Sequence, residues 1–178
     1  MFIFIRKDII SVINKIKSEK IGGIIMQSIL NKQKTLMISS LDSEKNPRIS
    51  YAPYVFMDNK FYIYISKVAE HYYNISNNSN VSIMVIEDES NVDVTFARSR
   101  ISFDAEAKMI EDKEEIMSKF SEIQGKTIMD LLRGLDFNLF EINVGKGRLV
   151  KGFGKAYDVE LKDGEWQTTQ VVIEKQHQ

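Results

Sequence analysis

The chain has 178 residues, which is enough for one compact domain with terminal extensions. Hydrophobic residues make up 43% of it and charged residues 28%, so disordered, collagen-like and low-complexity classes are excluded. No cysteine is present, which excludes disulfides, iron–sulfur clusters, thiolate metal sites and cysteine nucleophiles. The formal net charge of −1 is not the basic footprint of a nucleic-acid-binding protein, so no nucleic-acid partner is expected.

The N-terminal segment is expected to be a helical extension. Its opening run MFIFI is apolar but too short for a signal peptide or a membrane span, so we predict a cytoplasmic protein with no membrane partner. Residues 8–20 place isoleucines at helical spacing, and a second short helix is expected over about 24–32. We therefore expect an N-terminal helical extension over residues 1–31 and one domain over residues 32–178, and we assign no function to residues 1–25.

From Lys34 onward the periodicity is that of β-strands. Short segments rich in Ile, Val, Tyr and Phe are separated by turn residues, which is typical of an antiparallel meander. The four predicted strands span residues 34–41, 47–57, 60–66 and 79–87, with a short helix at 68–76. In the second and third strands both alternating sets of side chains are largely apolar, so both faces are predicted to be covered.

The second half of the chain predicts a half-exposed strand, a helical pair and two further strands. Residues 98–109 alternate between apolar and polar side chains. Residues 112–133 have a helical pattern that breaks at Gly125, and the second helix carries an apolar stripe. Strands are expected at about 136–144 and 147–158, followed by a tail.

These elements predict a β-barrel with helices, in the α+β class. We expect an antiparallel split or closed barrel of six or more strands with helices at its ends. Apolar strands left on its outside favour a homodimer.

Four glycines form the most unusual local feature, within the segment GKGRLVKGFGKAY: Gly145, Gly147, Gly152 and Gly154. They do not satisfy G-x-G-x-x-G and do not open a helix, which excludes Rossmann and P-loop sites. One interpretation is a hairpin turn with bulges that bend a barrel strand. The other is that missing side chains let a flat ligand approach the backbone.

Ser66 and Lys67 stand between the third strand and the helix that contains His71. A hydroxyl, an ammonium group and free backbone N–H groups there could converge on an anion. The alternative is an ordinary N-cap followed by a solvated lysine. His71 alone is more often a surface or hydrogen-bonded histidine than a ligand.

The remaining candidates are charged residues and the second histidine. A metal held through nitrogen must use His71 or His177, because the sequence has no other histidine, although His177 lies where a frayed tail is the default. Asp136 precedes a strand and is either a helix-to-strand cap or a hydrogen-bond partner of an imidazole. Arg98 and Arg100 are either solvated surface residues or ligands for carboxylate or phosphate groups. No Ser-His-Asp or paired-carboxylate motif is present, so the residues alone predict no reaction.

Several segments in a fixed order carry a family resemblance: TLMISSLDSEKNPRISYAPYVF, YIYISKVAEHYYNISNNSNVSIMVIEDE, FARSRISFDAEA, LDFNLFEI and GRLVKGFGKAY. Over about residues 32–178 the chain resembles the HutZ/HugZ family of bacterial haem-utilisation proteins. That family belongs to the pyridoxamine-phosphate-oxidase-like, FMN-binding split-barrel superfamily.

The resemblance implies a homodimer that binds haem near the subunit interface and breaks the macrocycle with O₂ and an external electron donor. It implies that His177 is the axial ligand, that Asp136 hydrogen-bonds this histidine across the dimer, and that Arg100 handles haem. A secondary role falls on His71. Basic groups such as Arg100 or Lys151 are expected to face the propionates, and Gly152 and Gly154 to leave room beside the ring.

Two alternatives stay open. The first is a flavin enzyme of the same superfamily, in which Ser66 and Lys67 bind the FMN phosphate. The second is a haem carrier or storage protein without catalysis.

Overall fold

The computed structural model describes residues 22–172. Its strands are β1 (Thr35–Leu41), β2 (Pro47–Met57), β3 (Lys60–Ser66), β4 (Asn80–Ile86), β5 (Arg100–Ile110), β6 (Phe137–Lys151), β7 (Lys155–Lys162) and β8 (Glu165–Gln170). Its helices are α2 (Glu70–Asn77), α3 (Glu114–Gln124) and α4 (Lys126–Arg133), with 3₁₀ turns η1 (Glu89–Asn91) and η2 (Thr95–Ala97). Residues 22–32 are also helical.

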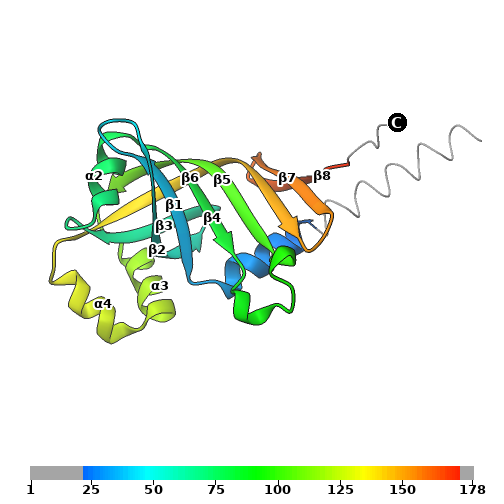
Figure 1. Cartoon of the computed structure of the whole chain (residues 1–178). Coiled ribbons are helices and arrows are strands. Elements are labelled where there is room, and N and C mark those ends of the chain that lie inside the picture. The colour runs from blue at the N-terminus through cyan, green and yellow to red at the C-terminus, as the bar shows by residue number, and fades with distance from the viewer. Residues whose placement is uncertain (1–21, 173–178) are drawn as a thin grey trace, which may run out of the picture.

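The strands form an antiparallel sheet that closes on itself. Its order is β3-β2-β1-β4-β5-β6-β7-β8, and an additional pairing joins β3 to β6. That pairing closes six strands into a barrel, while β7 and β8 extend from one end as a hairpin (Figure 1). Helix α2 lies at the opposite end. The predicted antiparallel split barrel with helices is therefore confirmed.

Two hydrophobic clusters lie on either side of the wall that β3 helps to form. The inner cluster includes Phe61, Phe103 and Phe140, all buried inside the barrel. The outer cluster packs Phe120 of α3 against Tyr62. Successive residues of a strand point to opposite faces, so Phe61 and Tyr62 reach different clusters. The prediction that β3 is covered on both faces is confirmed.

The helix over residues 22–32 packs into the inner cluster. Met26 and Leu30 are buried there, and the Tyr54 hydroxyl donates a 2.8 Å hydrogen bond to the Leu30 carbonyl. The helix also lies against β8, because a Cβ atom added to Gly22 would overlap the side chain of Thr168. This helix is thus packed as part of the barrel.

The C-terminal hairpin is held against the turn between β2 and β3. The Trp166 indole N–H donates a 2.7 Å hydrogen bond to Asn59 Oδ1, and Asn59 Nδ2 donates one of 3.0 Å to the Gly164 carbonyl. The Trp166 ring also lies 5.5 Å from the Phe103 ring, between centroids. The hairpin is therefore anchored to the barrel and does not project freely.

The predicted break near residue 145 is wrong. Strand β6 continues through both Gly145 and Gly147, and the turn falls instead over residues 152–154. A further strand, β8, occupies part of the segment that the sequence predicts to be a tail.

Close strand packing explains the misleading glycine. A Cβ atom on Gly147 would lie 2.6 Å from the Ser102 carbonyl oxygen and would overlap the Phe103 ring. The pairing of β5 with β6 is irregular between Phe103 and Ala105, as the alternative of a bulge proposed. Gly147 therefore allows the backbones of β5 and β6 to approach each other closely and does not form a turn.

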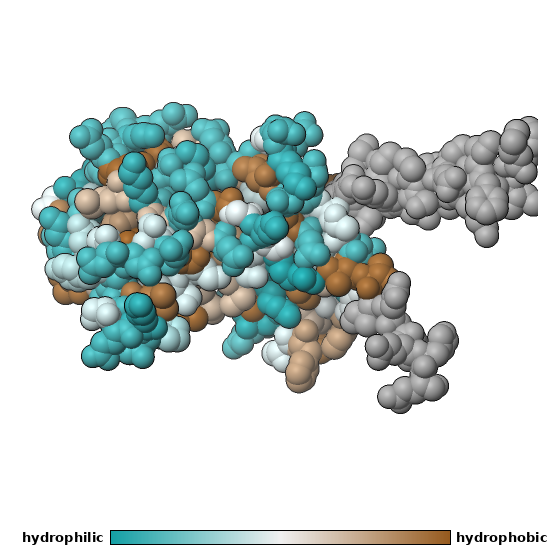
Figure 2. All heavy atoms as spheres, turned by 90° about the horizontal axis from the view of Figure 1, so that it is seen from above, coloured by the Kyte–Doolittle hydropathy of each residue, from teal (hydrophilic) through white to brown (hydrophobic). Residues whose placement is uncertain are grey.

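Some apolar side chains that the sequence predicts to be covered are exposed. On β2, Ile49 and Tyr51 face outward and are exposed, so within one protomer the first part of this strand is covered on one face only. On α4 the buried residue is Met129, whereas Ile128 and Leu131 of the predicted apolar stripe are exposed. Figure 2 shows such hydrophobic side chains scattered over a largely hydrophilic face.

Among residues 22–172, none of the helices has the length and apolar composition that crossing a membrane requires.

The two adjacent helical glycines predict opposite effects on stability. Gly22→Ala should lower the free energy of unfolding by about 1–3 kcal/mol, because the new methyl group overlaps Thr168. Gly23→Ala should raise it by up to about 1 kcal/mol, since nothing lies within 4 Å of its Cβ position and alanine favours helix. Urea denaturation of both variants checks this, and equal effects would contradict the packing of this helix against β8.

Candidate functional site

One group of candidate residues meets where β3 ends and β6 begins. Ser66 pairs with Phe137, and the Lys67 backbone N–H donates a 3.1 Å hydrogen bond to the Asp136 carbonyl. The Ser66 hydroxyl donates a 2.9 Å hydrogen bond to Asp136 Oδ1 and accepts one of 3.0 Å from the Val68 N–H. Asp136 is exposed, and no hydrogen bond to its Oδ2 occurs within the described part of the chain. We call this group the Asp136 end.

This geometry assigns Ser66 a role that neither sequence interpretation named. Helix α2 has Ala69 as its N-cap, with no side-chain hydrogen bond, so Ser66 is not an ordinary N-cap. Its hydroxyl instead holds a carboxylate in place. Ser66 Oγ lies 2.9 Å from Asp136 Oδ1, whereas the Lys67 side chain is exposed.

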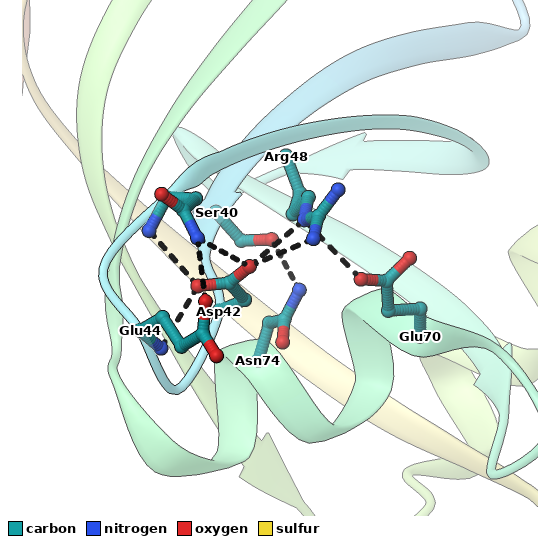
Figure 3. Close-up of polar contacts among 7 residues, drawn as sticks. Ser40, Asp42, Glu44, Arg48, Glu70 and Asn74 are labelled. Atoms are coloured by element: carbon teal, nitrogen blue, oxygen red, sulfur yellow. Dashed lines mark hydrogen bonds and ion pairs between the residues drawn. The ribbon is translucent and has the colours of Figure 1, made fainter.

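Helix α2 is tied to the barrel by polar contacts on both sides. The Tyr72 hydroxyl donates a 3.0 Å hydrogen bond to Asn138 Oδ1 on β6. The Asn74 amide donates one of 3.4 Å to Ser40 of β1 (Figure 3). These contacts fix the helix that carries His71.

A charged cluster reinforces the start of α2. Arg48 of β2 pairs with Asp42 at 2.9 Å and with Glu70 at 3.5 Å (Figure 3). Asp42 also accepts hydrogen bonds from the backbone N–H groups of Glu44 and Asn46, which lowers its pKa together with the Arg48 contact. The turn between β1 and β2 is thereby linked to the helix next to His71.

His71 is partly buried on α2. Its Nε2 atom is buried and has no hydrogen-bond partner. Burial lowers the pKa of His71 below its ordinary value of 6.5, and the neighbouring Glu70 carboxylate opposes that shift. The imidazole is therefore neutral at physiological pH and retains an unused nitrogen.

A second group of candidates lies at the other end of β6. Arg100, the first residue of β5, pairs with Val150, and Lys151 ends β6. Arg98 is the C-cap of η2 and precedes β5, so the strand predicted over residues 98–109 begins only at Arg100. The chain turns at η2, and the Arg98 guanidinium donates a 2.8 Å hydrogen bond to the Glu87 carbonyl and pairs with Glu89 at 3.3 Å.

The hairpin between β6 and β7 completes this second group. Gly152 and Gly154 have φ angles of 58° and 71°, a region that side chains disfavour, and an added Cβ would meet nothing within 4 Å at either position. Phe153 between them is exposed. We call Arg98, Arg100 and residues 151–154 the hairpin end.

The two ends lie far apart in one chain. They flank the fifteen residues of β6, a length of roughly 45 Å at the usual rise of a strand. Figure 1 shows α2 and the β7–β8 hairpin at opposite ends of the barrel. The structure thus brings Ser66, Lys67 and Asp136 together but leaves Arg98, Arg100 and Lys151 in a separate group.

The predicted axial ligand, His177, lies outside the described residues. The chain leads toward it from the hairpin end, because the Val171 N–H donates a 2.8 Å hydrogen bond to the Ala156 carbonyl. Among the described residues no group of three His, Cys, Asp or Glu side chains is placed to hold a metal ion.

Comparison with known proteins identifies the fold. Residues 25–151 match the family described as pyridoxamine 5'-phosphate oxidase. The chain is 35% identical over 156 residues to "Heme oxygenase HutZ" of Vibrio cholerae serotype O1, an alignment that covers 84% of this chain and 89% of that protein. The protein therefore belongs to the HutZ/HugZ family of pyridoxamine-phosphate-oxidase-like split-barrel proteins.

Two solved structures support this membership. Campylobacter jejuni ChuZ has a TM-score of 0.75 and 32% identity, covering 93% of this chain and 70% of that one. The structure of HutZ from Vibrio cholerae, described as a haem storage protein, has a TM-score of 0.66 and 38% identity, covering 72% of this chain and 94% of that one.

The sequence interpretation missed the direct contact between Ser66 and Asp136. A signal for it was available, since Ser66 ends one predicted strand and Asp136 precedes another. What the sequence lacked was the register of β3 against β6, which are separated by more than seventy residues.

The His71 environment predicts a pH-dependent stability. The folded state binds a proton at His71 less readily than the unfolded state, so this stabilising contribution is complete above pH 6.5 and is lost as the pH falls through the lower folded-state pKa. His71→Gln should therefore flatten the decrease of Tm with acidification between about pH 8 and pH 5. Calorimetry with His177→Gln as the control checks this. Identical pH profiles for wild type and His71→Gln would contradict it.

Proposed function

We propose that this chain is a cytoplasmic, homodimeric, haem-degrading oxygenase that releases iron from haem. Haem is the substrate. Oxygen from O₂ is inserted at a meso carbon of the ring with electrons from an external donor, and ring opening frees the iron. HutZ, to which the chain is similar, is described both as a haem oxygenase and as a haem storage protein, and this supports haem as the ligand.

The separation of the two ends carries the proposal of a shared site. The five residues from Val172 to His177 span at most roughly 18 Å when fully extended. That is less than the contour length of β6, which favours the Asp136 of a partner over that of the same chain as the residue His177 approaches. In a two-fold dimer, the tail of one protomer can approach Asp136 of its partner.

The residues at the Asp136 end suit an imidazole ligand. An iron-bound imidazole needs an acceptor for its second ring N–H, which fixes its tautomer and increases its electron donation to the metal. Asp136 supplies a carboxylate whose Oδ1 is held by Ser66 and whose Oδ2 accepts no hydrogen bond from the described residues. In this proposal His177 binds the iron and Asp136 orients it, while Lys67 and the partly buried His71 line the same end.

The residues at the hairpin end suit the edges of the substrate. Arg100 and Lys151 supply cations for the propionates, with Arg98 beside them. Gly152 and Gly154 leave open space at their Cβ positions, which a flat ring can use.

A non-catalytic haem carrier is the second candidate. The description of HutZ from Vibrio cholerae as a haem storage protein favours it. Carrier and oxygenase share the binding site and differ only in the fate of bound haem under O₂ and reductant.

The two histidines provide a matched test of haem ligation. His177→Ala should shift the haem absorption spectrum and weaken haem affinity about tenfold or more, because the axial bond is lost. His71→Ala should leave the spectrum of bound haem unchanged. Haem titration of both variants and wild type checks this. A wild-type spectrum for His177→Ala would refute the assignment, and a yellow protein that takes up no haem would indicate FMN instead. Loss of the wild-type haem bands under O₂ with reductant supports the oxygenase, and persistence supports the carrier.

Mixed dimers test the shared site. His177→Ala and Asp136→Asn should each impair haem turnover, while co-expression of the two chains should restore it in part. One site of each mixed dimer then combines a wild-type His177 with a wild-type Asp136 from the other chain. Turnover no higher than that of either variant alone would contradict ligation across the dimer.

A further inference from the structure

An apolar surface patch borders the Asp136 end. It consists of Val68, Leu131 and Leu135, and we call it the Leu135 patch. Val68 is 85% exposed, Leu131 59% and Leu135 54%. The Lys67 N–H donates a 3.1 Å hydrogen bond to the Asp136 carbonyl, and Val68 and Leu135 are the chain neighbours of these two residues.

The fold of one chain does not explain this patch. Helix α4 packs into the outer cluster through Met129, which is 2% exposed, and leaves Leu131 exposed. The Leu135 N–H donates a 3.0 Å hydrogen bond to the Leu132 carbonyl, so the turn after α4 directs the chain from Leu131 past Leu135 to Asp136. Contiguous apolar side chains beside a polar site are typical of a surface that a ligand or a partner covers.

The polar groups around the patch indicate what covers it. The exposed Lys67 lies next to Val68 in the chain and supplies a cation at the edge. Ser66 and Asp136 hydrogen-bond to each other, and the α4 carbonyls of Leu131 and Leu132 already accept backbone N–H groups. The patch therefore offers apolar contact and one cation with few groups left for hydrogen bonding. A flat aromatic ring with peripheral carboxylates has this chemistry, whereas a peptide segment would need partners for its backbone.

We propose that the Leu135 patch is the wall against which the face of the tetrapyrrole ring lies, with Lys67 toward a ring carboxylate. This inference rests on the proposed function and extends it, because it assigns ring recognition to Val68, Leu131 and Leu135. Recognition of the ring face is then separate from ligation of the iron.

The test uses a ligand with iron and one without it. In the full-length protein, Leu131→Ser and Leu135→Ser should each weaken binding of both haem and protoporphyrin IX about fivefold, and the double variant about twentyfold, because exposed leucine surface no longer gains a contact. Ile24→Ser is the matched control: this side chain is 70% exposed on the helix over residues 22–32 and belongs to neither end, so its loss should change neither affinity. His177→Ala should weaken the binding of haem but not of protoporphyrin IX, since only haem contains iron. Absorption and fluorescence titrations measure the two affinities.

The possible outcomes separate the two proposals. Wild-type affinities in the double variant would overturn the ring-contact assignment and leave the proposed function intact. Dissociation of the apo dimer by the double variant, seen by analytical ultracentrifugation, would also overturn it, because the patch would then be a subunit interface. Failure of the wild type to bind either ligand would overturn both proposals. Because the substituted side chains are more than half exposed, an unchanged Tm in the variants is expected and confirms that they fold.

Discussion

The structure depends on the pairing of β6 with its neighbours. Its first residues pair with β3, most of its length pairs with β5, and its last residues pair with β7. Only the pairing with β3 closes the barrel, and that closure buries Phe140 in the inner cluster. A long strand with three partners satisfies its backbone hydrogen bonds along nearly its whole length and holds distant parts of the chain in register.

The same strand determines where the candidate groups lie. Its register against β3 brings Ser66 to Asp136, and its register against β5 places Arg100 beside Val150. Neither group alone provides what the proposed haem site requires, because one provides a carboxylate and the other provides cations. The geometry of one chain thus provides a reason for two copies to act together, independent of the apolar strand surface at Ile49 and Tyr51.

Much of the barrel could be predicted from the sequence because strand periodicity is a local property. The alternation of Ile101 and Phe103 with polar neighbours correctly indicated an inner face, and Gly125 correctly marked the break between α3 and α4. Gly147 misled the prediction, since a glycine that permits close strand packing looks the same in sequence as one that permits a turn. Ile128 and Leu131 misled the prediction as well. Helical spacing shows that one face of a helix is apolar, but it does not show whether another part of the protein covers that face.

The sequence predicted which residues belong to the candidate site but not which of them lie together. The resemblance named Asp136 and His177, and the residues alone drew attention to Ser66 and the glycines. Which of them meet is a property of long-range register, which no local pattern contains. The contact of Ser66 with Asp136 and the separation of Arg100 from both therefore required the structure.

Strand β6 sets the distance between the Asp136 end and the hairpin end, and this limits how relatives can differ in the length of the strand. Inserting a single residue into it would reverse the facing of every side chain beyond the insertion and expel core residues such as Leu149. Inserting two would preserve the facing but move the ends about 7 Å further apart. Natural variation in this strand should therefore come in pairs of residues, accompanied by a compensating change in the reach of the C-terminal segment.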